Sequence, residues 1–264
     1  MRARRPHIAL VVLGAFLAAF AGLVLLIAGA VGGVESLRTL GVLLLVAAVV
    51  ALVFAGASLR RRGSEALPAL ARELGLRFSP DDSMGLAAAG LPFDRFRQHG
   101  VEVRNVMWGT WPGTSPGPPV DVTAFEQRYE THDPESGWQP TEWRFLALTE
   151  VPAECPPLWI ARGAGLVATR DRPRVRFEVE RFNREVTVLS PEAYFATALV
   201  TEEMMAWILD QAPVDVHFEL AGNRALTWMD RDEVLAGARL AVWAACEFRR
   251  RIPPVIGSLF PPQP

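Results

Sequence analysis

The sequence predicts an α+β soluble domain, a twisted antiparallel sheet or roll with helices on one side, preceded by a two-helix transmembrane hairpin. Three observations lead to this class. Two long runs without a charged residue fill most of the first 62 of the 264 residues. Short segments of alternating apolar and polar residues follow, joined by connections rich in Gly and Pro, which is typical of meandering antiparallel strands. Helix start signals appear among these strands and after them.

The uncharged runs are residues 8–33 and 39–59. Each is long enough for an α-helix to cross about 30 Å of hydrocarbon, which takes about 20 residues. The linker 34–38 has room only for a tight turn, so the two spans form a hairpin within residues 1–62. The apolar core of the first run is longer than that of a signal peptide, typically about 7–15 residues, which disfavours cleavage.

The arginines at the outer ends of the hairpin set its orientation. They are Arg2, Arg4 and Arg5 before the first span and Arg60, Arg61 and Arg62 after the second. Because positive residues stay on the cytoplasmic side, we expect a multi-pass protein of the plasma membrane with both termini in the cytoplasm. The second triplet is then expected to anchor the chain at anionic headgroups, with about 1 kcal/mol for each arginine.

The soluble domain is expected over residues 63–252. Ser64 is predicted to cap a short helix that presents Leu67, Leu70 and Leu74 on one face and ends at Gly75. The alternation then predicts strands at 101–108, 120–125 with Tyr129 beyond, 143–148, 158–160, 175–179 and 186–188.

Helices and one more hairpin complete the predicted domain. Ser190 and Thr201 are expected N-caps of two helices, and the acidic residue Asp230 is expected to cap a last, long helix. Between them, residues 214–228 alternate around Gly222 and predict a β-hairpin. We therefore expect about seven to nine strands, with residues 253–264 forming a proline-rich, irregular tail.

One polar cluster stands out, around residues 181–188 (RFNREVTV). Its members are Glu178, Glu180, Arg181, Asn183 and Arg184. The favoured interpretation is a β-hairpin with its turn at Asn183, because exposed charge pairs on strands are common and individually weak. The competing interpretation is a catalytic or binding cluster.

Other candidate sites are weaker. Residues 163–168 (GAGLVA) fit a dinucleotide-binding pattern, but a strand follows where the crossover helix would have to begin. His217 and Glu219 share one face of a strand, yet no third metal ligand lies at a suitable spacing, so an exposed strand histidine is predicted. Cys155 and Cys246 match no metal or redox spacing and are expected to be reduced and partly buried. We therefore expect no metal and no cofactor.

The overall composition constrains partners. The net charge is −2, which gives no support to a nucleic-acid partner. The protein contains no lysine, so its arginines cannot be interpreted as chosen over lysine for their geometry. Eight tryptophans and fourteen phenylalanines supply enough aromatic surface to line a ligand pocket, although such residues normally build a core.

Several short motifs occur in an order that resembles an uncharacterised family of actinobacterial two-helix membrane proteins with a C-terminal soluble domain of unknown function. The motifs are residues 91–93 (LPF), 105–109 (NVMWG), 125–129 (FEQRY), 182–186 (FNREV), 204–205 (MM) and 251–254 (RIPP). The resemblance implies an architecture, and it gives no catalytic residues to carry over.

Three functions remain in competition. The leading hypothesis is a membrane-tethered cytoplasmic interaction domain without catalytic activity, whose partners are the lipid bilayer and another membrane or cytoplasmic protein. The second is a lipid- or peptide-binding domain at the membrane surface. The third is an enzyme that uses Glu178, Glu180, Arg181 and Arg184. The sequence leaves the biochemical activity, the partner and the oligomeric state open.

Overall fold

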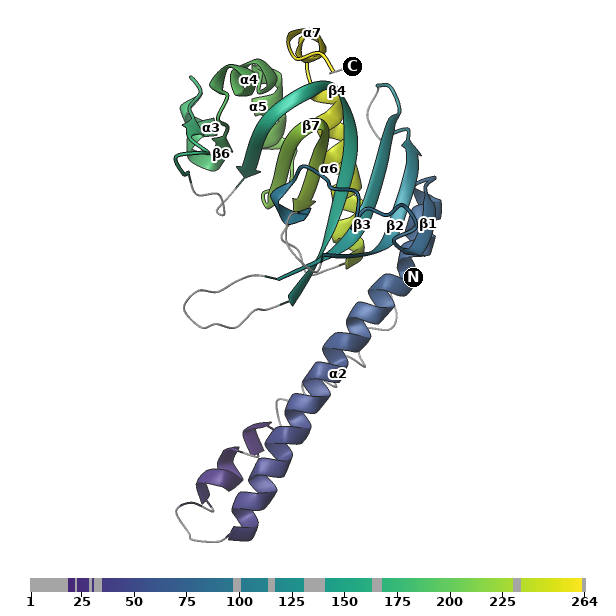
Figure 1. Cartoon of the computed structure of the whole chain (residues 1–264). Coiled ribbons are helices and arrows are strands. Elements are labelled where there is room, and N and C mark those ends of the chain that lie inside the picture. Colours follow the sequence, from purple (N-terminus) through teal and green to yellow (C-terminus); the bar gives the residue numbers. More distant parts are fainter. Residues whose placement is uncertain are drawn as a thin grey trace. The chain divides into compact units, whose positions relative to one another are not determined.

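The computed structural model describes residues 19–21, 23–28, 30, 35–96, 101–113, 117–130, 141–162, 168–229 and 234–262. The chain divides into two compact units, Met1–Glu65 and Ala66–Pro264. The second unit is an α+β domain with an antiparallel sheet, as the sequence predicts (Figure 1).

The helix α2 is continuous from Glu35 to Glu73. The predicted helix start at Ser64 is therefore wrong, because Ser64 lies inside this helix. Extending an existing helix adds a hydrogen bond for each residue, whereas a new helix requires a costly nucleus, so a single serine does not interrupt α2. The predicted end is confirmed: Gly75 adopts a φ of +72°, a left-handed conformation typical of a helix C-terminus. Leu67 and Leu70 are buried, as expected.

Within the first unit, ten large apolar side chains of the described residues between 20 and 50 are exposed. They are Phe20, Leu23, Val24, Ile27, Leu40, Val42, Leu43, Val46, Val49 and Val50. No helix within the described part of the chain combines the length and apolar character needed to cross a membrane. Within the first expected span, residues 8–18, 22, 29 and 31–33 lie outside the described residues. The same holds for the side chains of 51–65, which include Arg60, Arg61 and Arg62.

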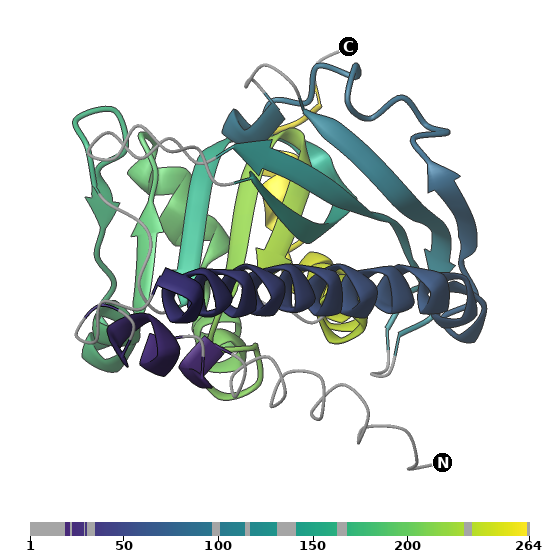
Figure 2. The same cartoon turned by 90° about the horizontal axis from the view of Figure 1, so that it is seen from below.

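The described residues of the second unit form one seven-stranded sheet in which every pair is antiparallel. Its path is β1 (Arg77–Asp81), β2 (Glu102–Trp111), β3 (Val120–Glu130), β4 (Thr141–Arg162), β6 (Val186–Leu189) and β5 (Arg174–Val175), while β7 (Val216–Met229) pairs with β4. Figure 2 shows the strong twist of this sheet. The strand count agrees with the sequence, although β1 was not predicted.

Strand β4 joins two segments, 143–148 and 158–160, that the sequence predicts as separate strands. Its first part pairs with β3 and its last part with β6. Register shifts between Glu150 and Leu158 accommodate extra residues, among them Pro152 and Pro157. Proline cannot donate to a ladder and is found in sheets at edges and bulges, so these prolines bend the strand without ending it.

Strand β7 likewise replaces the predicted hairpin. Both halves pair with β4, from Trp228 opposite Leu146 to His217 opposite Ala161. Gly222 takes a φ of +58° and lies opposite Cys155, within the irregular part of β4. The left-handed glycine therefore bends one strand and does not reverse the chain. His217 is 6% exposed and stacks on Trp228, which corrects the expectation of an exposed histidine.

The segment 175–185 is not the predicted hairpin. Only Arg174–Val175 is a strand, and Glu180–Glu185 forms the short helix α3. The side chain of Asn183 accepts a hydrogen bond from the N–H of Phe177 (2.9 Å) and donates one to its carbonyl (2.6 Å). Phe182 is buried edge-to-face against Phe177. These contacts use the backbone groups that a longer strand would have offered.

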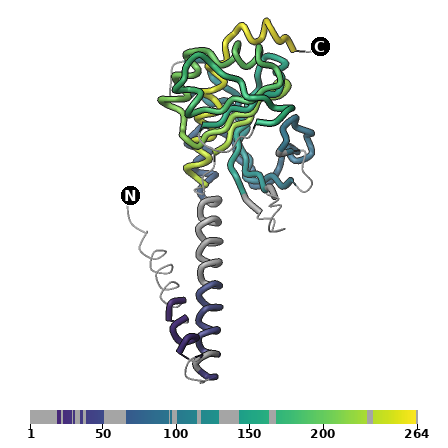
Figure 3. Tube along the Cα trace, turned by 90° about the vertical axis from the view of Figure 1, so that its left-hand side faces the viewer, coloured from purple at the N-terminus to yellow at the C-terminus, as the bar shows by residue number. Residues whose placement is uncertain are grey.

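The remaining helices are α4 (Ala193–Leu199), α5 (Glu202–Asp210), α6 (Val234–Arg251) and α7 (Val255–Leu259). Thr201 caps α5 through Met204 N–H, as predicted. Ser190 does not cap α4, because its hydroxyl bonds Glu192 N–H and Pro157 C=O instead. Residues 230–233, including the predicted cap Asp230, lie outside the described residues. Helix α7 corrects the expectation of an irregular tail; Figure 3 shows this yellow segment near the C-terminus.

The sheet is packed on both faces. Helix α6 runs along one face of β3, β4 and β7 (Figure 1) and contributes Ala238, Val242 and Phe248 to the larger core. The smaller core lies between the sheet and the segment that carries Leu86, Leu91 and Phe93. The C-terminal end of α6 thereby reaches the bend of β4, where the candidate site lies.

Candidate functional site

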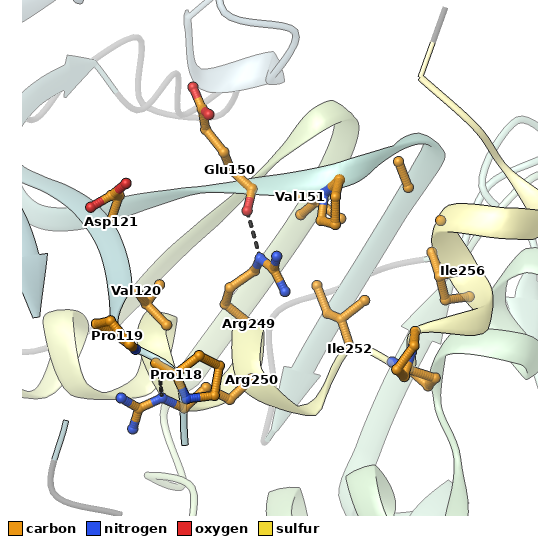
Figure 4. Close-up of a pocket in the computed structure, with 15 residues that line it drawn as sticks. Pro118, Pro119, Val120, Asp121, Glu150, Val151, Arg249, Arg250, Ile252 and Ile256 are labelled. Carbon is orange, nitrogen blue, oxygen red and sulfur yellow. Dashed lines mark hydrogen bonds between the residues drawn. The ribbon is translucent and has the colours of Figure 1, made fainter. Parts of the chain in front are cut away.

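A hollow opens where β4 leaves β3, beyond the last paired residues, Val122 and Thr149. It has a volume of about 600 Å³, in the range of small-molecule and peptide clefts. We call it the Arg249 hollow. It is lined by Pro118, Pro119, Val120, Asp121, Glu150, Val151, Pro152, Ala153, Arg249, Arg250, Ile252, Pro253, Pro254, Ile256 and Gly257 (Figure 4).

Arg249 is the polar centre of the hollow. Its Nε donates to the carbonyl oxygen of Glu150 at 2.6 Å, at the point where β4 departs from β3. Burial lowers the pKa of Arg249 from its ordinary value, because a charge is costly to remove from water. Among the described residues no carboxylate lies within 4.0 Å of its guanidinium. The guanidinium is therefore partly desolvated without a neutralising partner.

The neighbouring arginines differ from Arg249 because each of them contacts a buried carboxylate, which the two share. Glu247 is 1% exposed and accepts from Arg250 at 3.0 Å and from Arg251 at 2.7 Å. Arg251 also lies over the ring of Trp207, 4.8 Å from its centroid. Of the three consecutive arginines, Arg249 alone lacks a carboxylate partner among the described residues.

Arg250 also builds one wall of the hollow. It donates to the carbonyl oxygens of Pro112 (2.6 Å) and Pro118 (3.0 Å), and thereby holds the connection between β2 and β3. Its guanidinium lies against Gly113, which has a φ of +84° and no room for a Cβ atom. The left-handed φ favours glycine here, and a Cβ atom would require the Arg250 guanidinium to shift.

The rim of the hollow has two kinds of surface. Asp121 and Glu150 are exposed acids, and the carboxylate of Glu150 is directed away from the Arg249 guanidinium (Figure 4). Helix α7 contributes Ile256 to the hollow and leaves Val255 and Leu259 exposed. Tyr194 is 60% exposed and its ring lies 6.3 Å from that of Phe260, which adds to the apolar surface beside α7.

The polar cluster that the sequence singled out lies elsewhere, around α3. Arg181 pairs with Glu185 and Asp210, each at 3.1 Å, and hydrogen bonds to these two acids raise its pKa. Asn183 serves the structural bonds to Phe177. Glu178, Glu180 and Arg184 are exposed. The structure thus pairs Arg181 with two acids outside the predicted cluster, and the cluster's role in catalysis remains a prediction.

The other predicted residues have structural positions. Cys155 and Cys246 are buried free thiols, and burial raises the pKa of each to about 12, so neither is an activated nucleophile. His217 and Glu219 are buried in β7, and the described residues contain no cluster of three metal-binding side chains. Of the dinucleotide-like pattern at 163–168, residues 163–167 lie outside the described residues.

Sequence reasoning missed the Arg249 hollow. It interpreted the arginines at 249–251 only as favourable charges at a helix C-terminus. The available signal was the number of prolines that converge there, from 118–119, 152 and 253–254, on one run of arginines. Their convergence depends on the bend in β4, which the sequence pattern did not show.

Comparisons with known proteins add little to this description. No protein-family model matches the chain, and no curated protein matches it. A solved structure that is similar, "crystal structure of the mycobacterial trehalose monomycolate transport factor A, TtfA", has 16% sequence identity and a TM-score of 0.48. The match covers 74% of this chain and 98% of that chain. Likeness at this level carries no functional argument, so the function has to be argued from the hollow itself.

The hollow has the chemistry of a binding site. A guanidinium offers paired N–H donors that match a carboxylate or phosphate, and the surrounding prolines and aliphatic side chains add apolar surface beside it. The charged groups that line it are Asp121, Glu150, Arg249 and Arg250. Both acids are exposed at the rim.

Proposed function

We propose that this protein is a membrane-tethered, non-catalytic interaction domain that binds a partner protein at the Arg249 hollow. The observation that supports this most directly is Arg249 itself, a partly desolvated guanidinium with no carboxylate partner among the described residues. Holding an unpaired cation in an apolar setting costs free energy, and an incoming anionic group offsets that cost. The exposed apolar residues of α7 extend the binding surface.

The membrane tether is argued from the sequence. Residues 8–33 and 39–59 contain no charged residue, and in a bilayer a helix satisfies all of its backbone groups internally. The exposed apolar side chains between residues 20 and 50 support the same proposal, because large apolar surfaces in water are unusual. The arginine triplets at both outer ends favour cytoplasmic termini and place the second unit at the cytoplasmic surface.

Cysteine accessibility in intact cells tests this topology. A cysteine at position 36 (Ser36→Cys) should react with an impermeant thiol reagent, and one at position 258 (Ser258→Cys) should not. The native thiols add little background, since both are buried with a pKa of about 12. The reverse labelling pattern would place the domain outside the cell and contradict the proposal.

Site-specific photo-cross-linking tests partner binding. A photoreactive amino acid in place of Leu259, an exposed residue of α7 beside the hollow, should form a protein adduct in native membranes. The same amino acid in place of exposed Glu178 serves as the control and should not. The adduct should weaken in the Arg249→Gln background. Adducts to lipid alone, or equal protein adducts from both positions, would overturn the proposed function.

A further inference from the structure

Arg249 is the arginine of the hollow that is open to an anionic group. Arg250 and Arg251 share the single carboxylate of Glu247, at 3.0 and 2.7 Å. Arg249 uses its Nε on the Glu150 carbonyl, which leaves the Nη groups for a ligand. The hollow therefore offers one guanidinium that has no carboxylate partner among the described residues, with its Nη donors directed to a ligand.

The rim disfavours a ligand with more charge. Asp121 and Glu150 line the hollow and carry carboxylates. Like charges placed together across an interface are unfavourable and select against the wrong partners. A dianionic phosphate would meet two acids and only one free arginine, whereas one carboxylate matches the one free arginine.

The walls select the group next to that carboxylate. Val120, Val151, Ile252 and Ile256 are buried side chains of the lining, and five prolines line the hollow beside them. Binding of an apolar side chain against these walls is favourable, because it removes apolar surface from water. At about 600 Å³, the hollow holds a few residues of a peptide.

We infer that the hollow binds a polypeptide segment that presents one carboxylate beside an apolar side chain, with the carboxylate on Arg249. The carboxylate comes either from the C-terminus of the partner polypeptide or from an acidic side chain within it. This inference rests on the proposed function and names the chemistry of the partner. A polypeptide is favoured over a fatty acid because the apolar surface continues outside the hollow over Val255 and Leu259 of α7, where further residues of a segment can pack.

The test is binding of short peptides to the full-length protein reconstituted in lipid nanodiscs. The probe is a fluorescent pool of tetrapeptides that end in Leu, Val, Ile or Phe with a free carboxylate, followed by fluorescence anisotropy. The competitors are the same pool as C-terminal amides, an amidated pool with one internal Glu, octanoate and inorganic phosphate. The neutral amide pool should compete about tenfold or more weakly, since a charge-assisted hydrogen bond contributes that much.

Matched variants locate the binding. Arg249→Gln should weaken binding of the probe about tenfold or more. Arg249→Lys should retain part of the affinity for the probe, because the positive charge remains. Arg239→Gln, on the same helix and paired with Glu73 at 2.7 Å, is the control and should bind normally. Pro254→Glu keeps Arg249 and its bond to Glu150 but adds a competing carboxylate at the exposed rim, and it should also weaken the probe.

The outcomes distinguish the two sources of the carboxylate, and they distinguish this inference from the proposed function. Competition by the internal-Glu pool assigns the carboxylate to a side chain, and its absence assigns it to a polypeptide terminus; either supports the inference. Equal binding of free acids and amides, or displacement by octanoate or phosphate at lower concentration than by peptide, overturns it. If cross-linking from Leu259 captures a protein equally well with Arg249→Gln, the inference fails while an interaction domain remains.

Discussion

Two arginines, Arg181 on α3 and Arg249 at the end of α6, carry the same charge in opposite environments. Arg181 is exposed and lies between Glu185 and Asp210, which raise its pKa. Arg249 is half-buried, its pKa is lowered by burial, and its hydrogen bond goes to a carbonyl. A satisfied surface network contributes little and invites no ligand. A partly buried cation without a carboxylate partner favours binding of an anionic ligand. The burial and pairing of a charged side chain therefore locate the candidate site better than the number of charges in a region does.

The largest expected effect concerns the carboxylate that distinguishes Arg249 from its neighbours. Glu247→Ala leaves Arg250 and Arg251 without their buried partner, and Arg250 has a side chain only 6% exposed. Removing one member of a buried pair costs about 3–5 kcal/mol. Urea unfolding should show a loss of this size, whereas Glu73→Ala, in the exposed pair with Arg239, should leave the midpoint unchanged. Equal effects of the two substitutions would contradict the distinction between buried and surface pairs.

The buried thiol of Cys246, on the same helix as Arg249, provides a pH test. Burial raises the pKa of Cys246 from 9.0 to about 12, so the folded state keeps its proton after the unfolded state has lost it. The stability due to this thiol is complete below pH 9 and is lost as the pH rises toward 12. Over that window the wild type should lose about 1.4 kcal/mol per pH unit more than Cys246→Ala. Parallel stability curves from pH 9 upward would show that the thiol is not buried.

Gly222 bends strand β7 opposite the irregular part of β4. Its φ of +58° is strained for any residue with a Cβ, although the space around it permits one, with Glu154 Oε1 at 3.5 Å. Gly222→Ala should therefore cost about 1–2 kcal/mol through the backbone alone. Thermal unfolding measures this loss, and Gly237→Ala in α6, where a Cβ meets nothing within 4 Å, is the matched control. A neutral Gly222→Ala would mean that the left-handed bend is dispensable.

The smallest expected effect on stability sharpens the comparison between the two arginines. Arg249→Met removes one hydrogen bond, which lowers the free energy of unfolding, and removes a desolvated charge, which raises it. These two contributions should offset each other to within about 1 kcal/mol. Arg181→Met should leave the unfolding midpoint unchanged because its pairs are exposed. Of the two substitutions, only Arg249→Met should weaken cross-linking from Leu259. Loss of cross-linking with Arg181→Met instead would move the site to α3.

Local signals predicted those elements whose formation depends on nearby residues. The alternation at 101–108 and 120–125 predicted β2 and β3, Thr201 predicted the start of α5, and the apolar stripe of Val242 and Phe248 predicted the buried face of α6. The burial of both cysteines followed from the same reasoning. In each case the preference of a few neighbouring residues agrees with the tertiary packing, so the sequence by itself determined the α+β class and its antiparallel sheet.

Tertiary structure decided whether a glycine, proline or asparagine ends a strand. Gly222 could reverse the chain or bend it, and pairing of both halves of β7 with β4 selected the bend. Asn183 could form a turn, but its bonds to Phe177 and the burial of Phe182 selected a helix. The Arg249 hollow follows from the same decisions, because the bend of β4 brings prolines from three distant segments to one arginine. Contacts between residues far apart in the sequence supply the free energy that selects the bend of β4, and no local pattern encodes these contacts.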